Sequence, residues 1–507
     1  MASLLLSLLL AGSSAEAASY NGLAITPQMG WDNWNAFACD VDAELLASSA
    51  RSIVDLGLRD LGYEYVILDD CWSIGRNTSG NGSIIADLTK FPNGMAAVSE
   101  DVHSLGLKFG MYSDAGQYTC GQYEGSLGHE EVDAQTFANW GVDYLKYDNC
   151  YNNGNAGTQY LSRNRYNTMS QALNATGRPV LYSLCNWGED YPWNWGTTIA
   201  NSWRISGDVY DSFDRPDPRC PCDGPDAWDC GLPGFHCSTL NIINKAAFIP
   251  SKAQSGGWND LDMLTVGLGG QTDAEYVTLF SMWCAVKSPL IMGNDFSKIS
   301  NSTLSILTNA AAIAVNQDPL YSSAARRWYY DTSDVDAYGR GSIQMWSGAL
   351  NSTTDTEWDD MVVVLINGNN SPSTLNATLA DIFVDYGTGG TAAEIGISWE
   401  VRDLWAYRLT DEESQALIDA ANATTASGSG ASVEAWSNNS TMALYNATAT
   451  SYADGLEAKD ELLLGKVVST VAPSGTLTAS IDTHGAAMFR LRAVPTTTPA
   501  ARKRTDL

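Results

Sequence analysis

Short apolar runs alternate with segments of helical periodicity between residues 25 and 300. This alternation is typical of parallel strands joined by helices, because each helix returns the chain to the start of the next strand. We place eight strands, at residues 29–34, 65–70, 108–114, 144–149, 180–187, 203–208, 257–263 and 289–295. Eight strands joined in this way predict a closed (β/α)8 TIM barrel.

The predicted strands share polar or charged residues at their carboxyl ends. Asp69 and Asp70 end the second strand, and Asp148, Asp208 and Asp262 lie at the ends of later ones. A single Asp in such a place is usually an N-cap for the next helix. Seven strands in succession that end in polar groups are hard to explain as caps. Because the active sites of barrel enzymes lie at this end, we expect the reactive groups there.

The pattern changes to period-two strands beyond residue 341, with Gly, Asn, Ser and Thr between them. Strands are predicted at residues 342–346, 361–366, 399–401 and 487–491. We therefore predict a barrel over residues 19–325 and a C-terminal all-β antiparallel sandwich domain over 326–493. This domain lacks the carboxylate strand ends, so we expect a structural or carbohydrate-contacting role. Residues 494–507 are predicted to be disordered.

The N-terminus has the pattern of a secretory signal peptide over residues 1–18. An apolar run from Leu4 to Leu10 precedes Ala15-Glu16-Ala17, which matches the A-x-A cleavage rule. No later segment is long and apolar enough to span a bilayer. We therefore expect a secreted, soluble mature chain.

Two further features agree with export. Asn-x-Ser/Thr acceptor sites for N-glycans are dense along the chain. Cys220, Cys222, Cys230 and Cys237 cluster in a Pro/Asp/Gly-rich stretch, which predicts two short disulfide loops in an oxidising compartment. Their C-x-C-x7-C-x6-C spacing is not a usual zinc spacing. We predict neither a metal nor an organic cofactor.

The charge balance excludes polyanionic partners. Asp and Glu number 58 against 28 Lys and Arg, which gives a net charge of -30 and an isoelectric point near 4.3. Nucleic acid and anionic membranes would be repelled, so we expect neither as a partner. The chain has only 4 His and no H-E-x-x-H, G-x-S-x-G or P-loop motif. Carboxyl groups are therefore the most abundant reactive side chains.

Paired carboxyl groups are what glycoside hydrolysis requires. A retaining enzyme holds them about 5 to 5.5 Å apart, one as nucleophile and one as acid/base. Asp148 is our candidate nucleophile, because Lys146 projects to the same side of its strand and favours the ionised carboxylate. Asp208 is the candidate acid/base, and Arg204 lies four residues earlier to orient it or to hold the sugar.

Aromatic and acidic side chains near the strand ends are candidates for binding a sugar. Trp31, Trp34, Trp187 and Trp203 offer flat apolar faces for a pyranose ring, although a Trp in a strand is as often part of the core. The carboxylates of the Asp69-Asp70 pair can accept hydrogen bonds from sugar hydroxyls.

Six motifs carry a family resemblance, namely T-P-Q-M-G-W-D-N-W at 26–34, L-D-D-C-W at 68–72, Y-L-K-Y-D-N-C at 144–150, S-L-C-N-W-G at 183–188, W-R-I-S-G-D at 203–208 and G-W-N-D-L-D at 257–262. In these motifs the chain resembles the α-galactosidases (melibiases) of glycoside hydrolase family 27. The likeness is greatest to secreted fungal and yeast-type members, which share the C-P-C-D-G loop and the stretch 313–319. It extends from Tyr20 to about Arg492.

The resemblance implies a retaining mechanism with Asp148 as nucleophile and Asp208 as acid/base. The family's sugar contacts map onto Trp34, Asp69, Asp70, Tyr112, Lys146, Trp187, Arg204 and Asp262. The family's disulfides would pair Cys39 with Cys71, Cys120 with Cys150, Cys220 with Cys237 and Cys222 with Cys230. Cys185 and Cys284 would remain free, with Cys185 beside the sugar site.

Two positions differ within the family and bear on specificity and assembly. Asn186 stands where many animal and plant members have Glu, near the substituent on carbon 2 of the sugar. Because Trp187 beside it is bulky and no small Ser/Ala pair is evident, we favour galactose over N-acetylgalactosamine. Ser251 stands where yeast-type members have Gln, in a loop linked with oligomer contacts in some relatives, which puts homo-oligomer formation in doubt.

The leading hypothesis is therefore a retaining exo-α-galactosidase acting on melibiose, raffinose-type oligosaccharides and galactosyl side chains. An α-N-acetylgalactosaminidase is the alternative within the same class. A catalytically inactive sugar-binding protein is a second alternative, disfavoured because both candidate carboxylates and their polar neighbours are present. An aspartic protease would need paired Asp-Thr/Ser-Gly signatures, which are absent.

Overall fold

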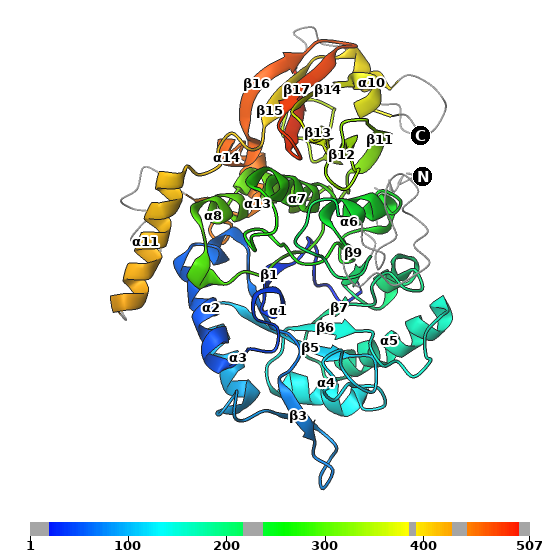
Figure 1. The fold of residues 1–507 in the computed structure, drawn as a ribbon, viewed down its shortest axis with the longest axis vertical. Coiled ribbons are helices and arrows are strands. Elements are labelled where there is room, and N and C mark those ends of the chain that lie inside the picture. The colour runs from blue at the N-terminus through cyan, green and yellow to red at the C-terminus, as the bar shows by residue number, and fades with distance from the viewer. Residues whose placement is uncertain (1–19, 216–236, 385–391, 428–443, 496–507) are drawn as a thin grey trace, which may run out of the picture.

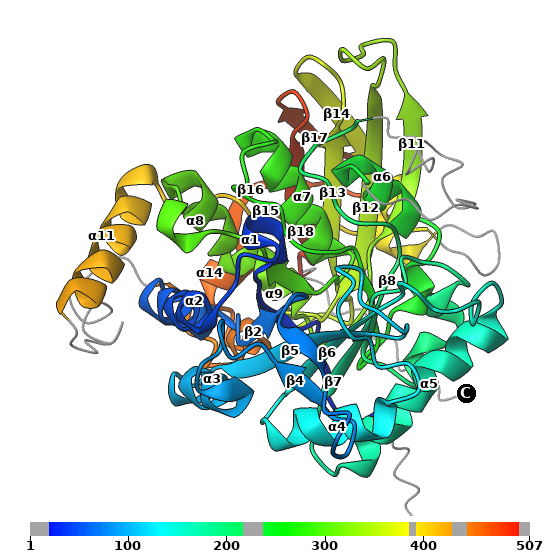
Figure 2. The ribbon, with the colours of Figure 1, turned by 60° about the horizontal axis from the view of Figure 1, so that its bottom comes forward.

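The computed structural model describes residues 20–215, 237–384, 392–427 and 444–495. The predicted signal peptide, most of the predicted tail and three cysteines, Cys220, Cys222 and Cys230, lie outside these ranges. The chain forms a barrel with a β-domain stacked on one side of it (Figures 1 and 2).

A curled sheet of eight parallel strands forms the barrel, in the order β10-β1-β2-β5-β6-β7-β8-β9. A parallel bridge between Leu264 and Met292 joins the segment after β9 to β10 and closes the ring. The predicted TIM-barrel fold is confirmed. The strands are β1 (Met29–Asp32), β2 (Tyr65–Leu68), β5 (Lys108–Asp114), β6 (Tyr144–Asp148), β7 (Leu181–Leu184), β8 (Ser202–Arg204), β9 (Trp258–Asp260) and β10 (Leu290–Met292).

Side chains alternate between the interior of the barrel and the helical layer, as the two-residue period of a strand requires. A small apolar cluster fills the interior, made of Tyr65, Ile67, Tyr144, Leu181, Met263 and Ile291. Two glycines make room for it. A Cβ at Gly30 would lie 2.5 Å from the carbonyl oxygen of Tyr65, and one at Gly110 would lie 2.7 Å from Cγ1 of Ile67. Close strand packing therefore requires glycine at both positions.

Helices cover the outside of the barrel, with a β-hairpin of β3 (Ser73–Arg76) and β4 (Ile84–Ala86) after β2. Side-chain caps fix where several helices begin, as at Asp42 before α2 and at Thr272 before α7. The helices are α1 (Trp34–Phe37), α2 (Ala43–Asp55), α3 (Gly94–Ser104), α4 (Glu130–Asn139), α5 (Gln159–Ala175), α6 (Thr239–Ala246), α7 (Asp273–Ala285), α8 (Asn301–Leu307) and α9 (Ala310–Asn316).

Two antiparallel sheets form the C-terminal domain, in agreement with the predicted sandwich. The larger has the order β11-β12-β13-β18-β15-β16, and the smaller pairs β14 with β17. A separate apolar cluster, with Trp399, Val363 and Leu477 among its members, lies between them. The strands are β11 (Ala325–Asp331), β12 (Ser342–Leu350), β13 (Asp360–Asn367), β14 (Ser373–Thr378), β15 (Trp399–Asp403), β16 (Lys466–Val471), β17 (Thr476–Ile481) and β18 (Ala486–Ala493).

Helices also occur in the C-terminal segment, where the period-two pattern predicted none. They are α10 (Leu379–Ile382), α11 (Asp411–Ser427), α13 (Tyr452–Glu457) and α14 (Glu461–Leu464). Helix α11 packs against α2 and α8 of the barrel. The Tyr452 hydroxyl donates to the carbonyl of Leu61, just before β2. Helices α11, α13 and α14 thus join the segment between β15 and β16 to the barrel, whereas α10 packs against β14 and β11 of the C-terminal domain.

Helices α6 and α7 lie between the barrel strands and the C-terminal sheets (Figure 1). The two domains therefore share one layer of helices. Within the described ranges, no helix combines the length and the apolar character that a membrane crossing requires.

Candidate active site

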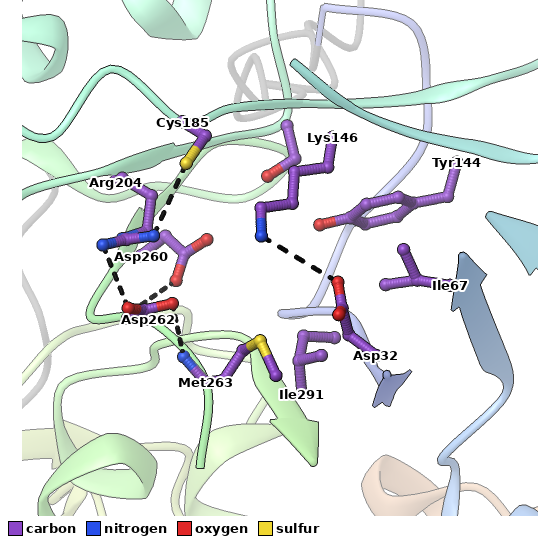
Figure 3. Close-up of a pocket in the computed structure, with 11 residues that line it drawn as sticks. Asp32, Ile67, Tyr144, Lys146, Cys185, Arg204, Asp260, Asp262, Met263 and Ile291 are labelled. Carbon is purple, nitrogen blue, oxygen red and sulfur yellow. Dashed lines mark hydrogen bonds and ion pairs between the residues drawn. The ribbon is translucent and has the colours of Figure 1, made fainter. Parts of the chain in front are cut away.

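A cavity of about 330 Å³ opens at the carboxyl ends of the barrel strands (Figure 3). Its base is formed by interior barrel residues, among them Ile67, Tyr144 and Ile291. Its walls carry charged or sulfur-bearing side chains from the ends of β1, β6, β7, β8 and β9, namely Asp32, Lys146, Cys185, Arg204, Asp260 and Asp262. The polar strand ends therefore converge around a cavity that is partly open to solvent.

Asp148 ends β6 and is buried. The hydroxyl of Tyr112 on β5 donates to its Oδ2 at 2.8 Å, and the backbone N–H of Asn149 donates to its Oδ1 at 2.9 Å. Burial raises the pKa of Asp148 to about 6, although Lys146 and the Tyr112 hydrogen bond act to lower it. The negative charge of Asp208 contributes to this rise in pKa, so the two carboxyl groups interact electrostatically.

Lys146 lies two residues before Asp148, but its direct partner is a different acid. Its Nζ donates to Oδ2 of Asp69 at 2.7 Å and lies 4.0 Å from Oδ2 of Asp32. It also lies 5.6 Å from the centre of the Tyr112 ring. Burial alone would lower the pKa of Lys146, but the carboxylates outweigh it and raise the pKa above its usual value. Lys146 therefore stays charged and acts on Asp148 through space.

Arg204 at the end of β8 joins two acids across the site. Its Nη2 lies 3.0 Å from a carboxylate oxygen of Asp208 and 3.0 Å from one of Asp262. Its Nη1 contacts the Cys185 sulfur at 3.5 Å. The Asp208 side chain is 52% exposed, whereas those of Arg204 and Asp262 are buried. Asp208 is thus held by a buried cation but open to solvent.

Strained backbone conformations occur directly after three of the strands that end at the site. Cys71, Trp187 and Asp262 follow β2, β7 and β9 with positive φ angles of 72°, 58° and 78°. Non-glycine residues adopt such angles at a cost, and they cluster at functional sites. At Asp262 this conformation lets both carboxylate oxygens accept backbone N–H groups, from Met263 at 2.8 Å and Val209 at 2.7 Å.

Asp69 and Asp70 are both buried at the end of β2. Asp69 binds Lys146, whereas Asp70 accepts backbone N–H groups of Gly121 and Cys71, each at 2.7 Å. Burial raises the pKa of Asp70, and these hydrogen bonds oppose the rise. Asp69 therefore faces the charged centre of the site, while Asp70 holds the loop after β5.

The tryptophans considered as sugar platforms divide into two groups. Trp31 and Trp203 are 0% exposed, and their indole N–H groups donate to Asn294 and Asn259. These two rings belong to the core and cannot contact a substrate. Trp34 and Trp187 are half-buried, so they remain candidates for sugar contact.

Disulfides fix the loops around the site. Cys39 is bonded to Cys71, and Cys120 to Cys150. The Cys120 sulfur lies 3.5 Å from Oδ2 of Asp148, so the second disulfide contacts the candidate nucleophile. Cys237 is also disulfide-bonded, and the other cysteines of that cluster lie outside the described residues. Cys185 and Cys284 are free and buried.

Asp32 and Asp260 belong to the site although sequence reasoning left them out of the candidate set. Burial and the neighbouring Asp69 raise the pKa of Asp32, and burial raises that of Asp260 to about 6. Both residues stood in the polar strand-end motifs, which was the available signal. One further cluster, Asp114 with Cys120 and Cys150, has the spacing of metal ligands, but the disulfide uses both sulfurs.

Comparison with known proteins decides the family. The family profile described as "Alpha galactosidase A" matches residues 26–217 and 226–318, and that of the α-galactosidase C-terminal β-sandwich domain matches 340–427. An α-galactosidase of Lachancea cidri is 53% identical over 478 residues, covering 94% of this chain and 96% of that one. The chain belongs to the α-galactosidases of glycoside hydrolase family 27.

Solved α-galactosidase structures share the whole fold. That of Saccharomyces cerevisiae, also determined with raffinose, has a TM-score of 0.86 and 50% identity, covering 94% of this chain and 99% of that one. α-Galactosidase I of Mortierella vinacea has a TM-score of 0.73 and 43% identity, covering 93% and 98%. This α-galactosidase therefore has both domains of its relatives.

Proposed function

We propose that this α-galactosidase is a retaining exo-enzyme that removes terminal α-D-galactose from melibiose and raffinose-type oligosaccharides and from galactosylated glycans. One observation carries the proposal. A buried, hydrogen-bonded carboxyl group, Asp148, interacts electrostatically with a solvent-exposed one, Asp208, beside the cavity at the strand ends. Two interacting carboxyl groups, one of which can exchange protons with solvent, are what a double displacement requires.

In the first step, a carboxylate oxygen of Asp148 attacks C1 of the galactose, and the bond from C1 to the glycosidic oxygen breaks. The Asp208 carboxyl group gives its proton to that oxygen, so the leaving sugar departs as a neutral alcohol. Tyr112 and the backbone N–H of Asn149 hold one oxygen each, and each oxygen keeps a further lone pair for the attack. The product is a galactosyl ester on Asp148.

In the second step, the Asp208 carboxylate removes a proton from water, and the water oxygen attacks C1. The ester bond to Asp148 breaks, and galactose leaves with the α configuration. Asp208 is suited to this role because its side chain is half exposed and can exchange a proton with solvent. Arg204 keeps the carboxylate oriented through both steps.

The shape of the cavity supports action at chain ends. Interior barrel residues close its base, so only a terminal sugar can enter. Buried Asp32, Asp69 and Asp262 present acceptors for hydroxyl groups, and Lys146 presents a donor. The solved relative from S. cerevisiae with raffinose supports the choice of an α-galactosyl oligosaccharide as substrate.

Three measurements test this proposal. Asp148→Ala and Asp208→Ala are each expected to abolish turnover of an aryl α-galactoside whose leaving group needs protonation, and normal activity in either variant would contradict the assignment. NMR of the earliest product from the wild type is expected to show α-galactose, whereas β-galactose would mean inversion. An aryl α-N-acetylgalactosaminide in parallel tests the substituent at carbon 2, and faster release of that sugar would favour the alternative specificity.

We also propose that the enzyme is exported and glycosylated. The disulfides in the barrel support an oxidising compartment. One acceptor site is an exception, because Asn369 is buried and its Nδ2 donates to the Ser373 hydroxyl at 3.1 Å. Glycopeptide mapping of the secreted protein is expected to find Asn369 unglycosylated and the exposed Asn376 glycosylated. An intact mass that begins at Met1 would contradict export through a signal peptide.

A further inference from the structure

The Asp208 segment, residues 205–215, is the first described part of the connection between β8 and α6, and residues 237 and 238 are the second. At its start the segment is tied to Cys237, just before α6, and to Asp262, after β9. The backbone N–H of Cys237 donates to the carbonyl of Asp208 at 2.6 Å, and that of Val209 donates to Asp262 at 2.7 Å. The Asp208 side chain itself is half exposed and bonded to Arg204. Little packing holds this side chain, so its position depends on how firmly the segment is anchored.

The middle of the segment is anchored to the start of α7. The carboxylate of Asp211 accepts the hydroxyl of Tyr276 at 2.9 Å, the backbone N–H of Gly270 at 2.6 Å and the side-chain amide of Gln271 at 3.1 Å. Since three groups from one neighbouring element converge on a single carboxylate, the segment can move only if the start of α7 moves with it.

The far part of the segment is anchored to the C-terminal domain. The buried ring of Phe213 stacks on His484, with ring centres 4.7 Å apart and planes inclined by 20°. His484 lies in the turn between β17 and β18 and has a φ of 57°. Its Nδ1 lies 2.6 Å from Oε1 of Glu275 on α7, and its carbonyl accepts the Thr278 hydroxyl at 3.0 Å.

The turn that carries His484 therefore holds the Asp208 segment in two ways. It contacts Phe213 of the segment directly, and it makes two polar contacts with α7, the helix to which Asp211 is bonded. Glu275 is also the capping residue of α7, because its Oε2 accepts the backbone N–H of Thr272 at 2.6 Å. Hydrogen bonds from His484 and Thr272 outweigh burial and hold the pKa of Glu275 below its usual value. A charged carboxylate therefore joins the His484 turn to the start of the helix that holds Asp211.

We infer that the C-terminal domain positions the general acid, and that His484 is a positioning residue acting through Phe213 on the Asp208 segment. This inference rests on the proposed role of Asp208. It gives the C-terminal domain a part in catalysis, although the domain contributes no residue to the cavity described above. A second contact between the C-terminal domain and this region agrees with the inference. Arg326 on β11 donates a hydrogen bond to Asn244 of α6, the helix that follows the segment.

The test compares two leaving groups. Departure of 2,4-dinitrophenol needs little help from an acid, whereas departure of glucose from melibiose depends on proton donation. The kcat/KM of both substrates reports the first, bond-breaking step. Loss of acid positioning therefore lowers kcat/KM for melibiose and spares that for the dinitrophenyl galactoside. A defect in packing alone lowers both equally.

Phe213→Leu and His484→Asn remove one ring each, and Asn tolerates the positive φ at position 484. We expect kcat/KM for melibiose to fall about tenfold and that for dinitrophenyl galactoside to fall less than about twofold, as suits a displaced acid. Phe213→Tyr keeps the ring and is expected to behave as the wild type. The matched control is Phe383→Leu, because Phe383 stacks on Trp399 at 4.6 Å wholly inside the C-terminal domain.

The outcomes separate this inference from the proposed function. If Asp208→Ala cleaves melibiose normally, Asp208 is not the general acid and both ideas are overturned. If Asp208→Ala spares only the dinitrophenyl substrate, while Phe213→Leu and His484→Asn change both substrates equally, the positioning role alone is overturned. A selective loss in Phe383→Leu would likewise overturn it, because that change does not touch the Asp208 segment. Thermal unfolding confirms that each variant is folded.

Discussion

Charged side chains are buried in two regions of this α-galactosidase, and their arrangement differs. Around the cavity, carboxyl groups outnumber cations. Two cations, Lys146 and Arg204, face five buried acids, namely Asp32, Asp69, Asp148, Asp260 and Asp262. The pKa values of Asp148 and Asp260 rise to about 6 because burial disfavours their charge.

Where the C-terminal sheet meets the barrel, the charges instead alternate in sign. Arg490 on β18 is fully buried and donates to Asp360 on β13 at 3.0 Å. Arg492 donates to Thr353 and lies 3.1 Å from Glu400. Asp318, after α9 of the barrel, lies 3.9 Å from Arg490. We call these residues the interdomain charge cluster.

The difference separates buried charge that serves chemistry from buried charge that serves stability. An excess of buried carboxyl groups beside a cavity reduces the stability of the fold, and it supplies groups whose protonation can change near the working pH. Alternating charges lie beside opposite charges within the fold, and removing one of them is strongly destabilising because it leaves its neighbour buried without a counter-charge. Equivalent substitutions in the two regions should therefore have opposite effects.

The largest effect is expected from Asp148→Asn. Because Asp148 is the proposed nucleophile, kcat for an aryl α-galactoside should fall by about 10⁴-fold or more. Stability should not fall, because the substitution removes an unfavourably buried charge and keeps a polar group of the same shape. Steady-state kinetics and thermal unfolding measure the two quantities. A variant that loses its activity only by unfolding would contradict this separation.

The matched substitution in the interdomain charge cluster is Asp360→Asn. It leaves the guanidinium of Arg490 buried without its closest counter-charge, which should reduce the free energy of unfolding by about 3 kcal/mol. The kcat/KM of the folded variant should stay close to that of the wild type. Urea unfolding and kinetics at low temperature measure these quantities. Unchanged stability would show that this cluster is not what holds the domains together.

Much of the barrel and its site follows from sequence pattern alone. The eight strands and their polar carboxyl ends could be predicted because they leave local patterns in the sequence. These patterns are the two-residue period of a strand and the polar residues where a strand ends before the next helix. The same period explains which tryptophans are buried. Asp32 and Arg204 face the cavity, so Trp31 and Trp203, one residue earlier, must face the helices. Two-residue alternation could therefore have excluded both rings as platforms.

Other features depend on contacts between distant segments and have no local signal. Phe213 and His484 are far apart in sequence, and only the packing of two domains brings their rings together. Lys146 was expected beside Asp148, but its bond to Asp69 depends on how β2 and β6 meet across the barrel. The helices after β15 were missed because they pack on the barrel rather than continue the sandwich.

A smaller effect, of opposite sign to that of Asp360→Asn, is expected from Asp260→Asn. Because its folded pKa is about 6, ionisation of Asp260 destabilises the fold as the pH rises from about 4 through 6. The variant lacks this charge, and its amide oxygen can still accept the N–H of Asp262. It should be more stable by about 2 kcal/mol at neutral pH and no more stable at about pH 4. Thermal unfolding across this range tests it, and a stabilisation independent of pH would refute the charge argument.

The smallest expected effect concerns the hydrogen bond between Tyr112 and Asp148. The Tyr112 hydroxyl donates to Asp148 and favours its ionised form, so Tyr112→Phe should raise the pKa of Asp148 above about 6. The acidic limb of kcat/KM, which needs ionised Asp148, should then move to higher pH by about one unit, the scale of one hydrogen bond to a charge. Tyr147→Phe is the control, because no hydrogen-bond partner of the Tyr147 hydroxyl is found among the described residues. A limb that moves to lower pH, or moves equally in the control, would show that Tyr112 does not set the charge of the nucleophile.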